Sequence, residues 1–154
     1  MEDLKTILYA EDNPKDVELT LEALSDHNLA NNVTVVRDGV EAMEYLHCEG
    51  KYKERKAGNP AVLLLDLKLP RMDGIEVLRA IRSDAALKML PVVMLTSSRE
   101  QQDLIKSYEL GVNSYVVKPV DFKDFFEAIR LVGVFWALIN EVPPDHTVSN
   151  KNKS

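Results

Sequence analysis

One of the most apolar runs of this chain ends in a carboxylate. Asp66 directly follows residues 61–65, which read Ala-Val-Leu-Leu-Leu. Buried strands of parallel sheets are continuous apolar runs, so this pattern predicts a central strand that carries one charged group to the edge of a sheet. At such an edge a carboxylate can act as a nucleophile toward a phosphoryl group or as a ligand of a cation.

Further polar residues follow apolar runs in the same way. They are Glu11 and Asp12 after residues 7–10, Thr96 after residues 91–95, and Lys118 after residues 115–117. Ligands of open parallel sheets bind beyond the carboxyl ends of the strands. We therefore expect these side chains to meet Asp66 at one edge of the sheet.

Three carboxylates in one place repel one another unless a cation lies among them. Mg²⁺ suits such a set because it prefers oxygen ligands. Lys118 would then pair with one phosphoryl oxygen and Thr96 would donate a hydrogen bond to another. Each residue alone is compatible with a helix cap or a turn, but together they predict phosphoryl transfer to Asp66.

The elements that must position these residues alternate between strand-like and helix-like patterns five times, which predicts an α/β fold with a parallel sheet. Strands are expected at residues 7–10, 33–36, 61–65, 91–95 and 115–117. Asn13 and Pro14 suit the start of the first helix, and Gly111 suits the end of the fourth. We expect one domain over residues 1–139 and a flexible C-terminal tail over residues 140–154.

The composition argues against several classes of partner and location. The chain has 154 residues and a formal net charge of −6, which argues against nucleic acid and anionic membranes as partners. It contains one cysteine, so no internal disulfide is expected, and no apolar stretch reaches the length of a membrane span. A cytoplasmic protein is expected.

The order of these motifs resembles the receiver domain of two-component response regulators. The matching segments are Glu11-Asp12, Asp66, Pro70-Arg71-Met72-Asp73-Gly74, Thr96-Ser97 and Lys118-Pro119. The resemblance implies a flavodoxin-like, doubly wound sheet of five strands in the order 2-1-3-4-5 with five helices. It also implies that a histidine kinase phosphorylates Asp66, so that the protein is not an enzyme beyond its own phosphorylation and dephosphorylation.

The same resemblance assigns roles to individual residues. Asp12, Asp66 and the backbone carbonyl of Lys68 would ligate Mg²⁺, with Glu11 helping through water. The Lys118-Pro119 bond would be cis. Tyr115 matches the switch aromatic of the family, which moves inward when Thr96 is drawn toward the phosphate.

The last helix predicts an interface. One apolar stripe should face the sheet, while Leu131, Phe135 and Leu138 lie on a second line, and a helix that is apolar on two sides is normally covered twice. We expect a homodimer through the fourth helix, the last strand and the last helix. The long segment before Asn59-Pro60 and this helix resemble the single-domain response regulators associated with phytochromes, which implies a bacterial phytochrome as the kinase.

Two other functions remain open at this point. A phosphatase of the haloacid-dehalogenase type also combines Asp, Thr, Lys and Mg²⁺, but that class begins with Asp-x-Asp, whereas this chain has Asp66-Leu67-Lys68 in mid-sequence. A phosphorylation-independent binding module would leave the acidic cluster without a role.

Overall fold

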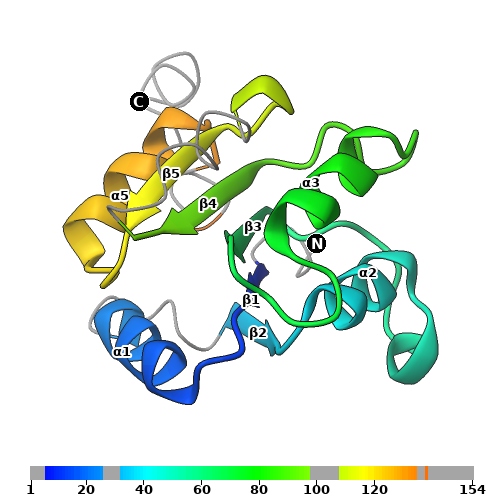
Figure 1. Ribbon diagram of the computed structural model, residues 1–154, viewed down its shortest axis with the longest axis horizontal. Coiled ribbons are helices and arrows are strands. Elements are labelled where there is room, and N and C mark those ends of the chain that lie inside the picture. Colours follow the sequence, from blue (N-terminus) through cyan, green and yellow to red (C-terminus); the bar gives the residue numbers. More distant parts are fainter. Residues whose placement is uncertain (1–5, 26–31, 98–107, 135–137, 139–154) are drawn as a thin grey trace, which may run out of the picture.

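The computed structural model describes residues 6–25, 32–97, 108–134 and 138. Five parallel strands in these residues form one sheet: β1 (Ile7–Ala10), β2 (Val33–Val36), β3 (Val62–Asp66), β4 (Val92–Thr96) and β5 (Ser114–Val117). They are arranged in the order β2-β1-β3-β4-β5 (Figure 1). The strand order expected from the resemblance is confirmed.

Helices cover both faces of the sheet. The helices α1 (Pro14–Ser25) and α5 (Phe122–Leu131) pack on one face, and α2 (Gly39–His47) and α3 (Gly74–Arg82) pack on the other (Figure 1). Side chains of β1 alternate between the two resulting cores, with Tyr9 on the α1 and α5 side and Leu8 on the α2 and α3 side. A sheet that is buried on both faces explains why the strands are apolar without alternation.

The part of the chain that the structure describes contains these four α-helices and a short 3₁₀-helix, η3 (Gly50–Tyr52). The expected helix between β4 and β5 falls mainly on residues 98–107, outside the described residues, although Tyr108 and Glu109 are helical. Gly111 has a φ of +92°, the conformation expected of a glycine that ends a helix. In the described ranges, no helix has the length and apolarity that a transmembrane segment requires.

Side-chain caps fix where the helices begin. Asn13 Oδ1 accepts hydrogen bonds from the backbone N–H groups of Lys15 (2.8 Å) and Asp16 (3.2 Å), so α1 starts at Pro14 as predicted. Asp73 forms a capping box with Glu76 at the start of α3. This box places the first turn of α3 directly after the loop that follows Asp66.

The last helix is shorter than predicted. Leu131, Phe135 and Leu138 were expected on one helix, but α5 ends at Leu131, and Gly133 adopts a φ of +82°. The Val134 N–H donates to the Ile129 carbonyl (3.2 Å), closing a helix C-terminus of the kind that a left-handed glycine permits. The regular hydrogen-bonding of α5 is therefore interrupted at Gly133, whereas Leu138 is again helical, with its N–H donating to the Val134 carbonyl (3.2 Å).

A single arginine joins three segments at the opposite end of the sheet from Asp66. The Arg82 guanidinium, at the end of α3, donates to the carbonyl oxygens of Gly111 (2.7 Å) and Leu90 (2.8 Å) and to Asn113 Oδ1 (3.0 Å). Leu90 precedes β4, and Gly111 and Asn113 precede β5. Arg82 thus secures the loops from which these two strands start.

Candidate functional site

Asp66 is the last residue of β3, and its carboxylate is buried, with 2% of the residue exposed. The chain turns sharply after it, because the Lys68 N–H lies 3.4 Å from Asp66 Oδ1. The first residue of α3, Gly74, packs against the Asp66 backbone: a Cβ at Gly74 would lie 2.4 Å from the Asp66 carbonyl oxygen. Only a residue without a side chain allows α3 to begin so close to the end of β3.

Two more acids lie beside Asp66, as predicted. Glu11 and Asp12 directly follow β1, the strand that pairs with β3. One carboxylate oxygen from each of Glu11, Asp12 and Asp66 lies within 4.8 Å of the other two. Glu11 is buried, with 1% exposed, whereas Asp12 faces solvent. The carboxyl ends of two neighbouring strands thus bring three acids into one cluster.

The protonation of Glu11 reflects this crowding of negative charge. Its burial, together with the hydrogen bond to Asp66 and the charge of Asp66, raises the pKa of the Glu11 carboxyl to about 7. Near neutral pH a proton therefore competes with any cation for this group.

Lys118, the first residue after β5, provides the positive charge. Its ammonium nitrogen lies 3.2 Å from Asp66 Oδ2, 3.3 Å from Glu11 Oε1 and 3.1 Å from Asp16 Oδ2. The sequence predicted that Lys118 meets Asp66 and Glu11 at this edge of the sheet. Asp16 was missed, because it lies within α1 and does not follow a strand; the only signal was its place in the first turn of a helix that starts directly after Asp12.

The surrounding acids keep Lys118 charged. Burial alone lowers the pKa of a lysine, but the charges of Asp66 and Glu11 and the hydrogen bond to Asp16 outweigh that effect and raise the pKa of Lys118 above its ordinary value. An ammonium in contact with Asp66 is therefore present throughout the physiological pH range.

Thr96 is the last residue of β4 and is 2% exposed. The register places it beside the end of β3, because Asp66 pairs with Leu95. Its hydroxyl donates to the Ser97 carbonyl (2.9 Å), and its own carbonyl accepts from the Lys118 N–H (2.8 Å). The Lys118-Pro119 peptide bond is cis, as expected from the resemblance.

The three acids fit a small divalent cation. They offer only carboxylate oxygens, the ligands that Mg²⁺ and Mn²⁺ prefer. Three carboxylates share the single Lys118 ammonium nearby, so the ionised cluster holds more negative charge than Lys118 neutralises. A bound cation would remove that excess.

Comparison with known proteins decides the family. The model of the response regulator receiver domain matches residues 7–130. Response regulator Rcp1 from Synechocystis sp. is 40% identical over 132 residues, a match that covers 86% of this chain and 88% of Rcp1. The chain belongs to the response regulator receiver domain family.

Solved structures place this receiver among phytochrome-associated relatives. The bacteriophytochrome response regulator AtBRR is 60% identical, with a TM-score of 0.80 over 89% of this chain and 98% of AtBRR. RtBRR, also a bacteriophytochrome response regulator, is 58% identical, with a TM-score of 0.80 over 91% of this chain and 84% of RtBRR. The phosphorylated cyanobacterial phytochrome response regulator RcpA is 40% identical (TM-score 0.71; 91% of this chain and 98% of RcpA). The Mn²⁺-bound form of Rcp1 is 38% identical (TM-score 0.69; 90% and 99%).

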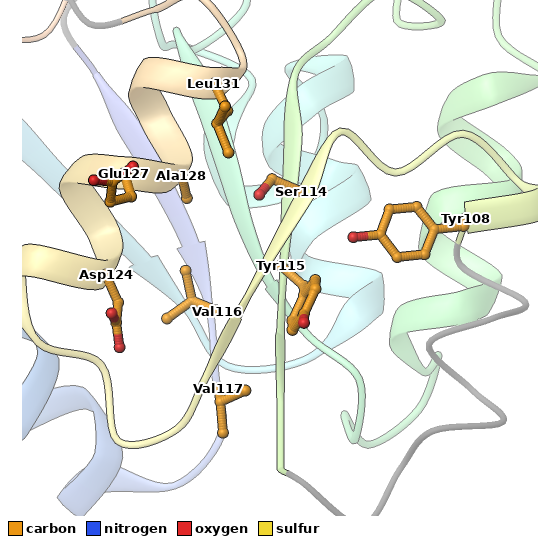
Figure 2. A pocket seen from close by; sticks show the side chains of 9 residues that line it. All are labelled: Tyr108, Ser114, Tyr115, Val116, Val117, Asp124, Glu127, Ala128 and Leu131. Atoms are coloured by element: carbon orange, nitrogen blue, oxygen red, sulfur yellow. The ribbon is translucent and has the colours of Figure 1, made fainter.

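The receiver carries an exposed groove between β5 and α5, with a volume of about 380 Å³ (Figure 2). Tyr115 on β5 is 41% exposed and meets Tyr108 edge to face, with ring centroids 6.2 Å apart. Leu131, at the end of α5, is 71% exposed. The groove also contains the acids Asp124 and Glu127 at its α5 side (Figure 2).

Only part of the interface predicted from the sequence is exposed in the structure. Leu131 is exposed, in agreement with the prediction. Leu138 is not: it is 3% exposed, belongs to the core between α1, α5 and the sheet, and follows the interruption of the helix at Gly133. Phe135 lies outside the described residues.

Proposed function

We propose that this receiver accepts a phosphoryl group on Asp66 from a histidine kinase and signals through contacts of its own surface. The observation that carries the proposal is the environment of Asp66. Its buried carboxylate lies 3.2 Å from the Lys118 ammonium and within the cluster formed with Glu11 and Asp12. Positioning and charge neutralisation are the main demands of phosphoryl transfer.

In the proposed reaction, a carboxylate oxygen of Asp66 forms a bond to the phosphorus of a phosphohistidine. The bond from phosphorus to the histidine nitrogen breaks, and that nitrogen leaves with the electron pair. Lys118 donates a hydrogen bond to one phosphoryl oxygen. Thr96, at the end of the neighbouring strand, donates its hydroxyl to another after giving up its bond to the Ser97 carbonyl.

A divalent cation, Mg²⁺ in our proposal, would be held by Asp12, Asp66 and the Lys68 carbonyl, with Glu11 helping through water. When bound, it supplies positive charge against the phosphoryl oxygens. The acidic cluster supports this assignment, as does the Mn²⁺-bound form of the relative Rcp1. The receiver's own contribution is to hold these acids at adjacent strand ends.

We infer that the kinase is a bacterial phytochrome. Similarity to AtBRR and RtBRR, both bacteriophytochrome response regulators, supports this partner. The match covers 98% of the AtBRR chain. We also propose that the receiver has no enzymatic activity toward other substrates.

For the output we propose a homodimer through the face formed by β5 and α5. The exposed apolar side chains of Leu131, Tyr115 and Val117 support such an interface. Tyr115 would act as the switch, moving inward when Thr96 turns toward the phosphoryl group. That movement would separate Tyr115 from Tyr108 and alter the groove of Figure 2.

Incubation with acetyl phosphate and Mg²⁺ tests the central proposal. The wild-type protein should gain the mass of one phosphoryl group, and hydroxylamine should remove it. Asp66→Asn should gain none, because the nucleophile is absent. Asp124→Asn removes an aspartate of the exposed groove instead and should be labelled like the wild type.

Labelling that persists in Asp66→Asn would show that another residue is the acceptor. A wild-type protein that is never labelled, even by a phosphorylated kinase, would favour the phosphorylation-independent binding module.

A further inference from the structure

Lys118 has a third carboxylate partner that the proposed reaction does not use. Asp16 Oδ2 lies 3.1 Å from the ammonium nitrogen, as close as Asp66 and Glu11. The Asp16 side chain is 33% exposed, whereas the side chains of the other two partners, Glu11 and Asp66, are 1% and 3% exposed. Asp16 thus contacts the Lys118 ammonium, which neutralises the site, but Asp16 itself is not buried within the site.

The scaffold fixes Asp16 in place. Its backbone N–H donates to Asn13 Oδ1 (3.2 Å), the cap of α1. Its carbonyl oxygen lies 3.4 Å from the hydroxyl of Tyr9, a fully buried side chain of β1 that also lies 3.0 Å from Thr20 Oγ1. The first turn of α1 is therefore attached to the sheet, and the Asp16 carboxylate is presented to Lys118 by a rigid element.

Asp16 is distinct from the three acids that would hold a cation. Glu11, Asp12 and Asp66 form the group in which one carboxylate oxygen from each residue lies within 4.8 Å of the other two. A cation bound there would offset the charges of these three acids, but it would leave the contact between Asp16 and Lys118 in place. Asp16 would consequently still be paired with Lys118 when a phosphoryl group arrives on Asp66.

We propose that Asp16 is a positioning residue that competes with the phosphoryl group on Asp66 for the Lys118 ammonium. The inference rests on the proposed function and adds a control on how firmly the phosphoryl group is held. Asp16 keeps the ammonium oriented, and its negative charge reduces the attraction that Lys118 exerts on a phosphoryl dianion. A site with Asp16 therefore binds a phosphoryl group less tightly than the same site without that charge.

Beryllofluoride, an analogue of the phosphoryl group, measures this effect without any transfer step. Titration calorimetry at saturating Mg²⁺ should show that Asp16→Asn binds beryllofluoride about fivefold more tightly than the wild type, the change expected for one nearby charge. Asn keeps an oxygen that can accept from Lys118, so the substitution removes the charge while retaining the shape. Asp16→Glu, which restores the charge, should bind beryllofluoride like the wild type.

Two further measurements separate this role from other effects of the substitution. Glu18→Gln removes the same charge from an exposed position of α1 and should leave beryllofluoride affinity unchanged. Thermal unfolding of each variant reports on folding: if Asp16 only stabilises the start of α1, Asp16→Asn will lower the melting temperature and leave the affinity unchanged.

Equal or weaker binding by Asp16→Asn, with the wild type binding normally, overturns the role of Asp16 and leaves the proposed function intact. Tighter binding by Glu18→Gln to the same extent overturns it as well, because net charge would then explain the effect. A wild type that does not bind beryllofluoride, or an Asp66→Asn variant that binds it as well as the wild type does, overturns the proposed function and the role of Asp16 together.

Discussion

At the level of single residues, the surroundings of Glu11 bring the pKa of its carboxyl into the neutral range. It is buried beside Asp66, accepts a hydrogen bond from the Asn13 N–H at 3.3 Å through Oε2, and contacts Lys118 through Oε1. With a pKa of about 7, it carries a proton in the folded protein below that pH, where an ordinary glutamate is ionised.

Mg²⁺ affinity should therefore fall as the pH is lowered through 7. The affinity falls rather than rises because the proton on Glu11 must leave before the carboxylate can contribute, directly or through water, to the binding of a cation. Calorimetric titrations from pH 8 to pH 5.5 should show a loss of at most about tenfold per pH unit below 7, which levels off toward the affinity of Glu11→Gln. Glu11→Gln should bind Mg²⁺ more weakly at pH 8 and show a much flatter profile; a wild-type affinity that is constant over this range would contradict the assignment.

The sequence predicted those site residues that directly follow a strand. Asp66, Glu11, Asp12, Thr96 and Lys118 all lie where a parallel sheet gathers its ligands, so the order of elements was enough to place them. Asp16 was missed because its approach to Lys118 depends on the angle at which α1 leaves the sheet, and no periodicity encodes that angle.

Among the elements, the start of α2 and the loop after β3 are in unusually close contact. The Gly39 N–H lies 3.4 Å from the Pro70 carbonyl, and a Cβ at Gly39 would lie 1.8 Å from the Met72 carbonyl oxygen. Arg71, which has a φ of +66°, pairs with Asp38 through its Nε at 3.1 Å. The cap of α2 thus holds the loop that leads from Asp66 to α3.

Gly39→Ala should destabilise the protein by about 1–3 kcal/mol, because a methyl group at this position collides with backbone that cannot swing aside as a side chain would. Urea unfolding measures the change. Gly133→Ala is the matched variant: nothing lies within 4 Å of its Cβ, so the only cost is the positive φ, about 1 kcal/mol. Equal stability of Gly39→Ala and the wild type would mean that the loop after β3 adapts more readily than its contacts indicate.

The order and type of the elements followed from the sequence, but the end of the last helix did not. Apolar residues continue past Gly133, and a helical stripe can be drawn through them to residue 139. A glycine within an apolar stripe is equally compatible with a helix interior and with a C-terminal turn. The turn forms here, and Leu138, which follows it, packs into the core.

Considered as a whole, the molecule has two cores that are separated by the sheet and a groove at the surface of one of them, since Val116 and Ala128 belong to that core and also line the groove. Phe125 and Ile129 of α5 are fully buried against the sheet, while Leu131, near the same end of the helix, is 71% exposed. Residues that stabilise the fold and residues available to a partner are thus adjacent in sequence but distinct in position.

Leu131→Glu should prevent homodimer formation, because it places a charge in the proposed apolar interface beside the acids of the groove. Light scattering at micromolar concentration, with and without beryllofluoride, measures the oligomeric state. Folding should be little affected, since an exposed substitution changes stability by about 0.5 kcal/mol or less. Met89→Glu is the control: Met89 is 83% exposed and is not among the residues that line the groove, so this variant should dimerise normally. A wild type that is monomeric under both conditions would exclude the dimer.

The hydrogen bonds of Arg82 lie at the end of the sheet opposite the candidate site. They join the end of α3 to the starts of β4 and β5, whereas Thr96 and Lys118 lie at the far ends of the same two strands. Loss of this one guanidinium would weaken the attachment of the loops that precede β4 and β5, at the end of the sheet that does not contain the phosphorylation site. Arg82 is accordingly the position at which to seek a temperature-sensitive allele, one that signals normally in the cold and fails on warming with every reactive group intact.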